Sequence, residues 1–215
     1  MQSSFFDVPD FLTADSDHQI LELENGRLDL YQALFPSQQA DELFAELQEA
    51  IAWRQETIRI QGRVLDIPRL QAWYGDPDSH YGYSGIRLDP LPWIPPLLTI
   101  LHRLEDMTQH RFNSVLCNLY RHGRDSVSWH ADNEAELGIN PLIASVSFGA
   151  TRRFQLKPRK GGDSISLELP HNSLLVMSGA LQHHWIHQIP KTQQPVGPRL
   201  NLTFRWVSRA AQADR

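Results

Sequence analysis

A histidine and an aspartate two positions apart, His130 and Asp132, form the clearest candidate for chemistry in this chain of 215 residues. Side chains at positions i and i+2 of an extended strand project from the same face, so both can reach one metal ion. A third ligand must come from elsewhere, and His183, His184 and His187 are candidates. Two histidines and one carboxylate that leave other coordination positions open suit non-haem Fe(II) and oxygen chemistry.

The segment 199–206 near the C-terminus, RLNLTFRW, alternates polar and apolar residues. Alternation with a period of two predicts a strand with one apolar and one polar face. The polar face consists of Arg199, Asn201, Thr203 and Arg205. One interpretation is a half-exposed strand with a solvated face. The other is a polar barrel interior that holds a dicarboxylate, because guanidinium groups bind carboxylates bidentately. Together with the metal motif, the second interpretation favours 2-oxoglutarate as the ligand.

A hairpin and two helices are expected before the main run of strands. Residues 21–31 predict the hairpin, because an Asn-Gly pair within them is a strong signal for a tight turn. The apolar stripe of residues 37–51 predicts a helix with Ser37 as its N-cap. A second helix is expected near residues 97–108, with a proline in its first turn.

From Phe112 onward the pattern predicts short strands separated by Gly, Pro, Asn or Asp. The expected strand segments are FNSVLCNLYR, SVSWHAD, IASVSFGA, RRFQLKP, SISLELP, SLLVMSG, HWIHQIP and RLNLTFRWV. Several short strands at this spacing are typical of a sandwich or barrel. The predicted fold class is α+β, with a double-stranded β-helix (jelly roll) core and the N-terminal helices packed on one sheet.

Four segments of the chain are similar to one known family. They are PRLQAWYGD (68–76), FNSVLCNLYRHGRDSVSWHADNE (112–134), PLIASVSFGATRRF (141–154) and PRLNLTFR (198–205). Through them the chain resembles the AlkB family of Fe(II)- and 2-oxoglutarate-dependent dioxygenases, from about Ile58 to Val207. The resemblance implies oxidative dealkylation of N-alkylated DNA bases, such as 1-methyladenine or 3-methylcytosine. The products would be formaldehyde, succinate and CO2, with dioxygen consumed.

The resemblance also divides the chain into three parts within one structural domain. Residues 1–57 are expected to form an N-terminal extension and a helix packed on the core. Residues 58–110 are expected to form a nucleotide-recognition lid and its supporting helix. Residues 111–215 are then the catalytic jelly roll.

Site residues follow from the resemblance by position. The implied iron ligands are His130, Asp132 and His187, which leaves His183 and His184 as neighbours and rivals for the third place. The residues implied around 2-oxoglutarate are Asn118, Tyr120, Arg199, Asn201, Thr203 and Arg205. One of the two arginines is expected to pair with the far carboxylate of this cosubstrate. The residues implied around the base are Arg69, Trp73, Tyr81, Tyr83, Ser84, Asn133 and Glu134.

The base-binding residues have two interpretations. Tyr83 resembles the position that stacks on a flipped base opposite His130, and cationic alkylated bases gain from aromatic faces. The alternative is that this Tyr/Gly stretch is only a packed surface loop. Trp73 equally fits the wall of the lid or the core.

Two departures from the family pattern bear on the substrate. Asn133 stands where related members carry an aspartate that faces the damaged base, which leaves Glu134 as the nearby acid. The stretch Ile60-Gln61-Gly62 stands where members that open duplexes carry an apolar or aromatic finger. Glutamine is a poor wedge between bases, so single strands, or duplexes already weakened by damage, are favoured over intact duplexes. The alternatives are the same chemistry on RNA or protein, a non-catalytic nucleic-acid-binding jelly roll, and a cupin-type metalloenzyme without a keto-acid cosubstrate.

The formal net charge of −5 at pH 7 is unevenly distributed. Residues 1–50 contain eleven acidic residues and one basic residue, a local charge of −10, whereas the rest of the chain carries +5. The acidic total therefore does not exclude a nucleic-acid partner. The basic run from Arg152 to Lys160 is interpreted either as a solvated hairpin tip or as a set of phosphate contacts.

The remaining composition favours an intracellular protein. The single cysteine, Cys117, excludes an internal disulfide and suits a reducing compartment. No apolar run approaches the ~20 residues needed to span a bilayer, and no secretory signal is visible at the start. We expect a cytoplasmic monomer without membrane contact.

Overall fold

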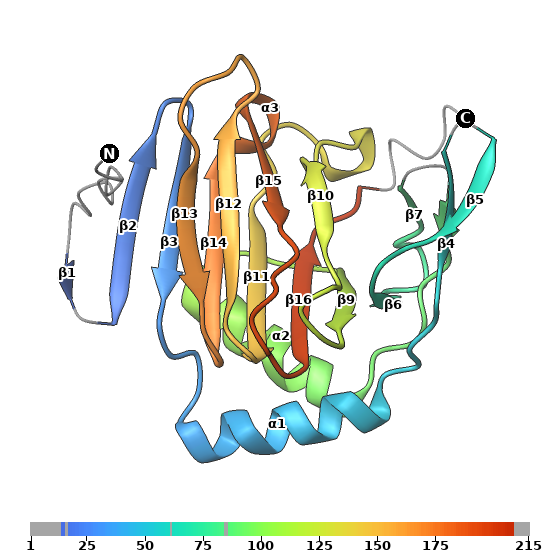
Figure 1. Cartoon of the computed structure of the whole chain (residues 1–215). Coiled ribbons are helices and arrows are strands. Elements are labelled where there is room, and N and C mark those ends of the chain that lie inside the picture. Colours follow the sequence, from blue (N-terminus) through green and yellow to red (C-terminus); the bar gives the residue numbers. More distant parts are fainter. Residues whose placement is uncertain (1–13, 16, 61, 84–85, 209–215) are drawn as a thin grey trace.

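The computed structural model describes residues 14–15, 17–60, 62–83 and 86–208. Within them two antiparallel sheets face each other (Figure 1). The larger sheet contains, in spatial order, β1 (Ala14–Asp15), β2 (His18–Leu23), β3 (Gly26–Tyr31), β14 (Ser173–Gly179), β11 (Ile143–Gly149), β16 (Arg199–Arg205), β9 (Ser114–Tyr120) and β6 (Leu70–Gly75). The smaller sheet contains β10 (Val127–His130), β15 (Trp185–Ile189), β12 (Arg152–Pro158) and β13 (Ile165–Leu169).

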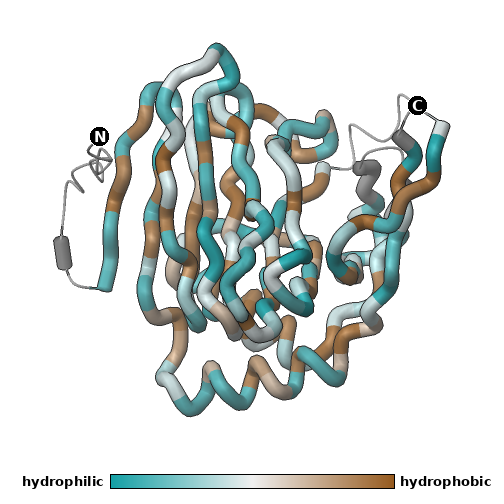
Figure 2. The backbone as a smooth tube through the Cα atoms, viewed as in Figure 1, coloured by the Kyte–Doolittle hydropathy of each residue, from teal (hydrophilic) through white to brown (hydrophobic). Residues whose placement is uncertain are grey.

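Two apolar cores stabilise this arrangement. The first lies between the larger sheet and the helices α1 (Ser37–Ala50) and α2 (Pro95–Thr108), and includes Leu47, Ile100 and Val146. The second lies between the two sheets and includes Leu175 and Phe154. Apolar and polar residues alternate along some strands, such as β13, which can bury one face, whereas the central strands of the larger sheet are buried on both faces (Figure 2). The molecule is thus layered as helices, larger sheet and smaller sheet, which is a jelly roll with helices on one sheet.

All eight segments predicted as strands after Phe112 form strands. The predicted hairpin is also present, as β2 and β3, and these two strands join the larger sheet through the pairing of β3 with β14. The helix prediction needs one correction. Helix α1 begins at Ser37 itself, and the residue before it, Pro36, makes no side-chain cap hydrogen bond. Ser37 is therefore the first helical residue and not the N-cap.

Two small hairpins lie beside β6, at the edge of the larger sheet. They are β4 (Thr57–Ile60) with β5 (Arg63–Asp66), and β7 (Tyr81–Tyr83) with β8 (Ile86–Leu88). Figure 1 shows the first of them projecting away from the sandwich. Gln61 lies outside the described residues. Two short elements complete the chain, the 3-10 helix η1 (Ala135–Leu137) and the helix α3 (Leu181–His184). No helix in the described part of the chain is long and apolar enough to cross a bilayer.

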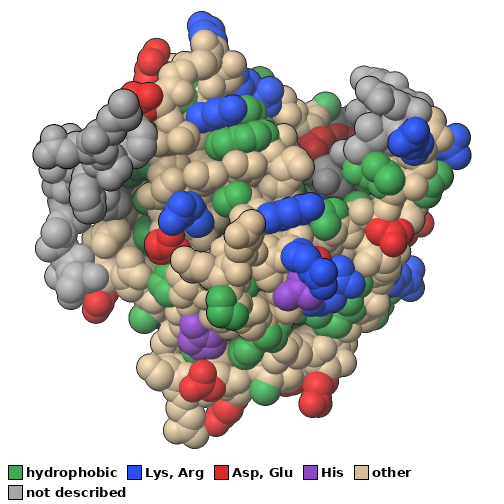
Figure 3. All heavy atoms as spheres, viewed as in Figure 1, with side chains coloured by type: hydrophobic (Ala, Val, Ile, Leu, Met, Phe, Trp, Pro, Cys, Tyr) green, Lys and Arg blue, Asp and Glu red, His purple; other side chains and the backbone are tan. Residues whose placement is uncertain are grey.

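The basic run from Arg152 to Lys160 is not a hairpin tip, because most of it forms strand β12. Arg152 is buried, whereas Arg153 projects outward and pairs with Glu168. The Nζ atom of Lys157 lies 4.4 Å from the ring centroid of Trp129. Figure 3, which views this side of the molecule, shows Lys and Arg side chains scattered among neutral ones. The run therefore supplies scattered basic side chains rather than one block of phosphate contacts.

Candidate active site

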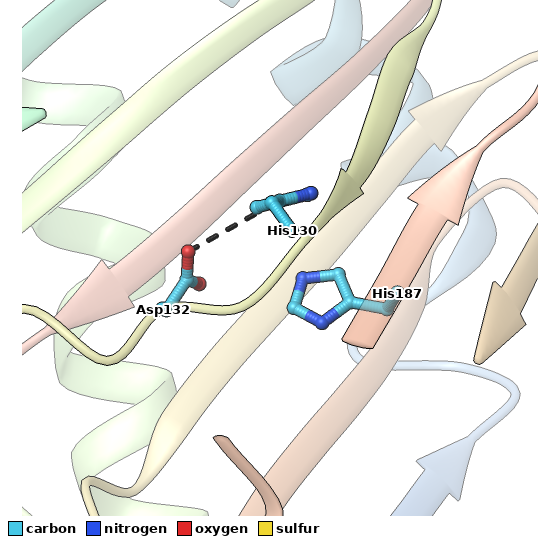
Figure 4. Close-up of side chains that lie close together, drawn as sticks. All are labelled: His130, Asp132 and His187. Atoms are coloured by element: carbon cyan, nitrogen blue, oxygen red, sulfur yellow. Dashed lines mark ion pairs between the residues drawn. The ribbon is translucent and has the colours of Figure 1, made fainter. Parts of the chain in front are cut away.

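Three side chains converge between the sheets, at the neighbouring strands β10 and β15 of the smaller sheet. His130 ends β10 and is the register partner of His187 on β15. Asp132 follows two residues after the end of β10, so the prediction that it lies on the strand was wrong. Potential ligand atoms of the three residues all lie within 4.8 Å of one another, and Figure 4 shows the side chains pointing into one space. His183 and His184 are exposed on α3, so His187 completes the triad.

The orientation of His130 leaves its outer nitrogen available to a metal. Its Nδ1 atom lies 2.8 Å from the backbone carbonyl oxygen of Ser128. Because a carbonyl only accepts hydrogen bonds, Nδ1 carries the proton. The outer nitrogen, Nε2, is then unprotonated, and its lone pair is available to a metal. That Nε2 lies 3.9 Å from Oδ1 of Asp132. The ring of His187 stacks on Phe154, with their centroids 5.2 Å apart, which fixes the second imidazole.

Asp132 is buried and held on two sides. Nη2 of Arg205 donates to its Oδ2 at 2.8 Å, and its backbone N–H donates to Oε1 of Gln182 at 2.9 Å. Burial raises the pKa of the Asp132 carboxyl, but Arg205 and the two histidines lower it more, so this pKa lies below its usual range. Burial lowers the pKa of His187 to about 3, and it lowers that of His130 as well. The site therefore offers one carboxylate and two neutral imidazoles, the donor set that suits a divalent transition metal.

The polar face of β16 lines a pocket next to this triad. Every residue of the strand is buried, so the interpretation as a solvated face is wrong. The polar contacts inside the pocket connect β16 to β11. Nδ2 of Asn201 donates to Oγ of Ser145 at 2.8 Å, and Oγ1 of Thr203 donates to Oδ1 of Asn201 at 3.2 Å.

The two arginines of β16 lie in different surroundings. Arg205 contacts the metal-binding triad, as described above, whereas Arg199 lies over the ring of Tyr120, with its Cζ 5.2 Å from the ring centroid. Nη2 of Arg199 donates to Oγ of Ser147 at 2.9 Å. Its buried Nε and Nη1 atoms find no hydrogen-bond acceptor among the described residues. Burial lowers the pKa of Arg199 to about 10, which still leaves it charged at neutral pH.

This arrangement fits 2-oxoglutarate. A keto acid that chelates a metal at the triad would point its far carboxylate along the pocket. The two open donors of the planar Arg199 guanidinium match the two oxygens of such a carboxylate. The structure therefore separates the two arginines that the sequence left as alternatives, with Arg205 at the metal end and Arg199 at the far end.

Arg69 and Asn118 close one wall of the pocket. Nε of Arg69 donates to Oδ1 of Asn118 at 2.7 Å, and Nη1 donates to the carbonyl oxygen of Ser126 at 3.2 Å. The side-chain amide of Gln71 also lies 2.9 Å from that of Asn118. Arg69 thus orients an amide at the cosubstrate end of the pocket.

Of the other residues expected around the base, the structure describes the side chains of Trp73, Asn133 and Glu134. Trp73 is buried and donates from Nε1 to the carbonyl oxygen of Ser79 at 2.9 Å, within a small apolar cluster with Leu116 and Val207. This corresponds to a core position. Asn133 is exposed and Glu134 is half-buried, both directly after the ligand Asp132. Tyr81 and Tyr83 belong to β7, but their side chains, together with Ser84, lie outside the described residues.

Several residues of the site were missed by reasoning from the sequence. Ser145 and Ser147 could have been found, because they alternate with apolar residues on β11 just as the polar face of β16 does. Phe154 occupies an apolar position of β12 that resembles any core position. Gln182 gave no signal, because it belongs to a four-residue helix without periodicity.

Comparison with known proteins agrees with this geometry. A family model described as "2OG-Fe(II) oxygenase superfamily" matches residues 27–205. The chain therefore belongs to the 2OG-Fe(II) oxygenases, whose metal and cosubstrate are Fe(II) and 2-oxoglutarate. Solved structures agree in fold, although their sequences are distant. "The structure of OsALKBH1" superposes with a TM-score of 0.60 at 15% identity, covering 87% of this chain and 99% of that one.

Curated relatives narrow the family further. The human "Alpha-ketoglutarate-dependent dioxygenase alkB homolog 3" is 43% identical over 192 residues, which cover 85% of this chain and 66% of that protein. The mouse "DNA oxidative demethylase ALKBH2" is 38% identical over 188 residues, 82% of this chain and 79% of that protein. Within the 2OG-Fe(II) oxygenases, this chain is a member of the AlkB family. It spans just under two thirds of the length of the alkB homolog 3 relatives.

Proposed function

We propose that the chain is an oxidative dealkylase of N-alkylated bases in DNA, with 1-methyladenine and 3-methylcytosine as the type of substrate. The observation that carries the proposal is the pocket itself. It places a His-Asp-His donor set at one end and the open donors of Arg199 at the other. The names of the relatives, a dioxygenase and a DNA oxidative demethylase, support the same reaction.

Different residues of the pocket would bind the metal and the cosubstrate. His130, Asp132 and His187 would hold Fe(II), and Arg199 would bind the far carboxylate of 2-oxoglutarate. With this cosubstrate and dioxygen, the bound iron supplies oxidation of the N-alkyl carbon while 2-oxoglutarate becomes succinate and CO2. The hydroxymethyl group formed on the base nitrogen then loses its hydroxyl proton to solvent and leaves as formaldehyde. The C–N bond breaks, and its electron pair returns to the ring nitrogen as the lone pair of the unmodified base. The buried walls of the pocket exclude bulk water from this chemistry.

Single-stranded DNA is the proposed form of the substrate. A base must leave its stack to reach a buried pocket, and unpaired bases do so at lower cost. Glutamine at position 61 supports this preference, because it would separate stacked bases poorly. Tyr81, Tyr83 and Ser84 remain the proposed contacts of the flipped base, with Asn133 and Glu134 on the side of the metal.

Release of formaldehyde tests the proposal. The substrate is a single-stranded DNA oligonucleotide with one 1-methyladenine, supplied with Fe(II), 2-oxoglutarate and air. We expect formaldehyde and unmodified adenine in equal amounts from the wild type and neither from D132A. A wild type that matches D132A would overturn the proposal in favour of a non-catalytic module.

The matched duplex and the matched RNA oligonucleotide sharpen this result. We expect both to react more slowly than the single-stranded DNA. Faster turnover of the duplex would overturn the strand preference, and turnover of the RNA alone would overturn DNA as the substrate.

A further inference from the structure

Arg152 is a buried arginine for which the reaction described above has no use. It begins strand β12, and only 3% of its surface is exposed. The next residue, Arg153, lies on the opposite face of the strand and pairs with the exposed Glu168 at 3.3 Å. Two adjacent arginines of one strand thus have opposite surroundings, one inside the sandwich and one in solvent.

The hydrogen bonds of Arg152 go to backbone carbonyls. Nη2 donates to the carbonyl oxygens of Asp125 at 2.9 Å and Pro190 at 2.7 Å. The carboxylate of Asp125 is occupied by Arg121, whose Nε and backbone N–H donate to it at 2.8 and 2.9 Å. The charge of Arg152 is therefore balanced by dipoles rather than by a hydrogen-bonded carboxylate. A buried cation in such surroundings is costly, so an uncharged side chain would serve better if the role were packing alone.

The guanidinium of Arg152 also faces Tyr120. Its Cζ lies 5.7 Å from the ring centroid, and the Cζ of Arg199 lies 5.2 Å from the same centroid. One buried aromatic ring therefore carries two cations, a contact that its π face favours. The positive charge of Arg152 also contributes to lowering the pKa of Arg199, after the larger effect of burial. Arg199 lines the pocket and Arg152 does not, so two like charges contact one ring at the end of the pocket that has open donors.

We propose that Arg152 is a positioning and specificity-determining residue for the far carboxylate of 2-oxoglutarate. It fixes Tyr120 against Arg199, and it adds a second positive charge behind the ring. An incoming carboxylate relieves the repulsion between the two arginines, so this end of the pocket selects dianionic 2-oxo acids. A 2-oxo acid with a methyl group in place of the far carboxylate gains nothing there. The inference rests on membership of the oxygenase family and not on the nucleic-acid substrate.

Ligand binding without turnover tests this role. The protein is loaded with Mn(II), kept free of oxygen, and titrated by calorimetry with 2-oxoglutarate and with 2-oxopentanoate, which has the same chain length but no far carboxylate. We expect R152M to weaken binding of 2-oxoglutarate by at least about tenfold and that of 2-oxopentanoate by less than about twofold. The matched control R153M should leave both affinities unchanged, because Arg153 lies on the outer face.

Two results would overturn the proposal. One is an equal loss for both ligands in R152M, which would make Arg152 a purely structural residue. The other is an unchanged affinity for 2-oxoglutarate. If R152M does not fold, R152K decides the question, because lysine keeps the charge and loses the planar fork. R152K should weaken 2-oxoglutarate alone, by about threefold, and an equal change for both ligands or no change would again contradict the proposal. Because no nucleic acid is present, this result is independent of the test for DNA dealkylation.

Discussion

The pocket between the sheets and the hairpin β4–β5 differ in how firmly their side chains are held. In the pocket, polar groups are buried and bonded to one another, as in the contact of Arg205 with Asp132. In the hairpin, all four residues of β5 are exposed, including the apolar Val64 and Leu65. A site that binds a metal and a small acid needs fixed geometry, since misplaced ligands lose affinity. A surface that meets a long polymer needs accessible side chains instead. Substitutions in the pocket should therefore have large effects on chemistry, and those in the hairpin small effects on affinity.

The largest effect is expected from D132A. This change removes the only carboxylate of the triad, together with the ion pair that it forms with the buried Arg205. We expect Mn(II) affinity to fall by more than about 100-fold, beyond the range typical for residues that only support a ligand. Calorimetric titration with Mn(II) measures it. N133A is the matched control, because Asn133 is exposed and its replacement should leave the Mn(II) affinity within about twofold of the wild type. Equal losses in both variants would contradict the assignment of the triad.

The second effect concerns Gln182, which accepts a hydrogen bond from the backbone of Asp132. Q182M keeps the length of the side chain and removes the acceptor, so Asp132 should lose its fixed orientation. We expect a loss of about 10-fold or more in Mn(II) affinity, within the range for groups that orient metal ligands. The neighbouring H183A is the control, since His183 is exposed on the same helix. A wild-type Mn(II) affinity in Q182M would show that the hydrogen bond to Gln182 is not needed to position Asp132.

The same contrast explains how much could be predicted from the sequence. Strand positions and the polar face of β16 follow from alternation, because a strand buries every second residue. Alternation does not tell which of Arg152 and Arg153 is buried, because both are arginines. The register of β12 with β13 and β15 decides it. The role of Gln182 depends on a contact across 50 positions of sequence, which no local pattern encodes. The family motifs named the iron ligands and the arginines, but only the structure separates Arg199 from Arg205.

A third effect concerns stability and its dependence on pH. Burial raises the pKa of Asp125, but the hydrogen bonds and charge of Arg121 lower it more, so its pKa lies below the ordinary value. A carboxyl with a lowered pKa in the folded state stabilises the protein above its unfolded-state pKa, and this contribution is lost as the pH falls through the folded-state pKa. We expect D125N to lower the free energy of unfolding by about 1–3 kcal/mol at pH 7, and by less near pH 3, which lies below the ordinary aspartate pKa of 3.8. Urea unfolding at the two pH values measures the difference, and a constant cost would contradict the ionic origin.

The smallest effect is expected in the hairpin. Val64 and Leu65 are 60% and 47% exposed, so replacing both with serine removes little buried apolar surface. The free energy of unfolding should change by less than about 0.5 kcal/mol, and 2-oxoglutarate binding should not change. If the hairpin meets the nucleic acid, the double variant should bind a methylated single-stranded oligonucleotide about threefold more weakly, since aromatic bases pack against apolar side chains. Fluorescence anisotropy with the labelled oligonucleotide measures this. A loss of 2-oxoglutarate affinity in the same variant would show that hairpin and pocket are coupled, and the separation between a rigid chemical site and an accessible recognition surface would then fail.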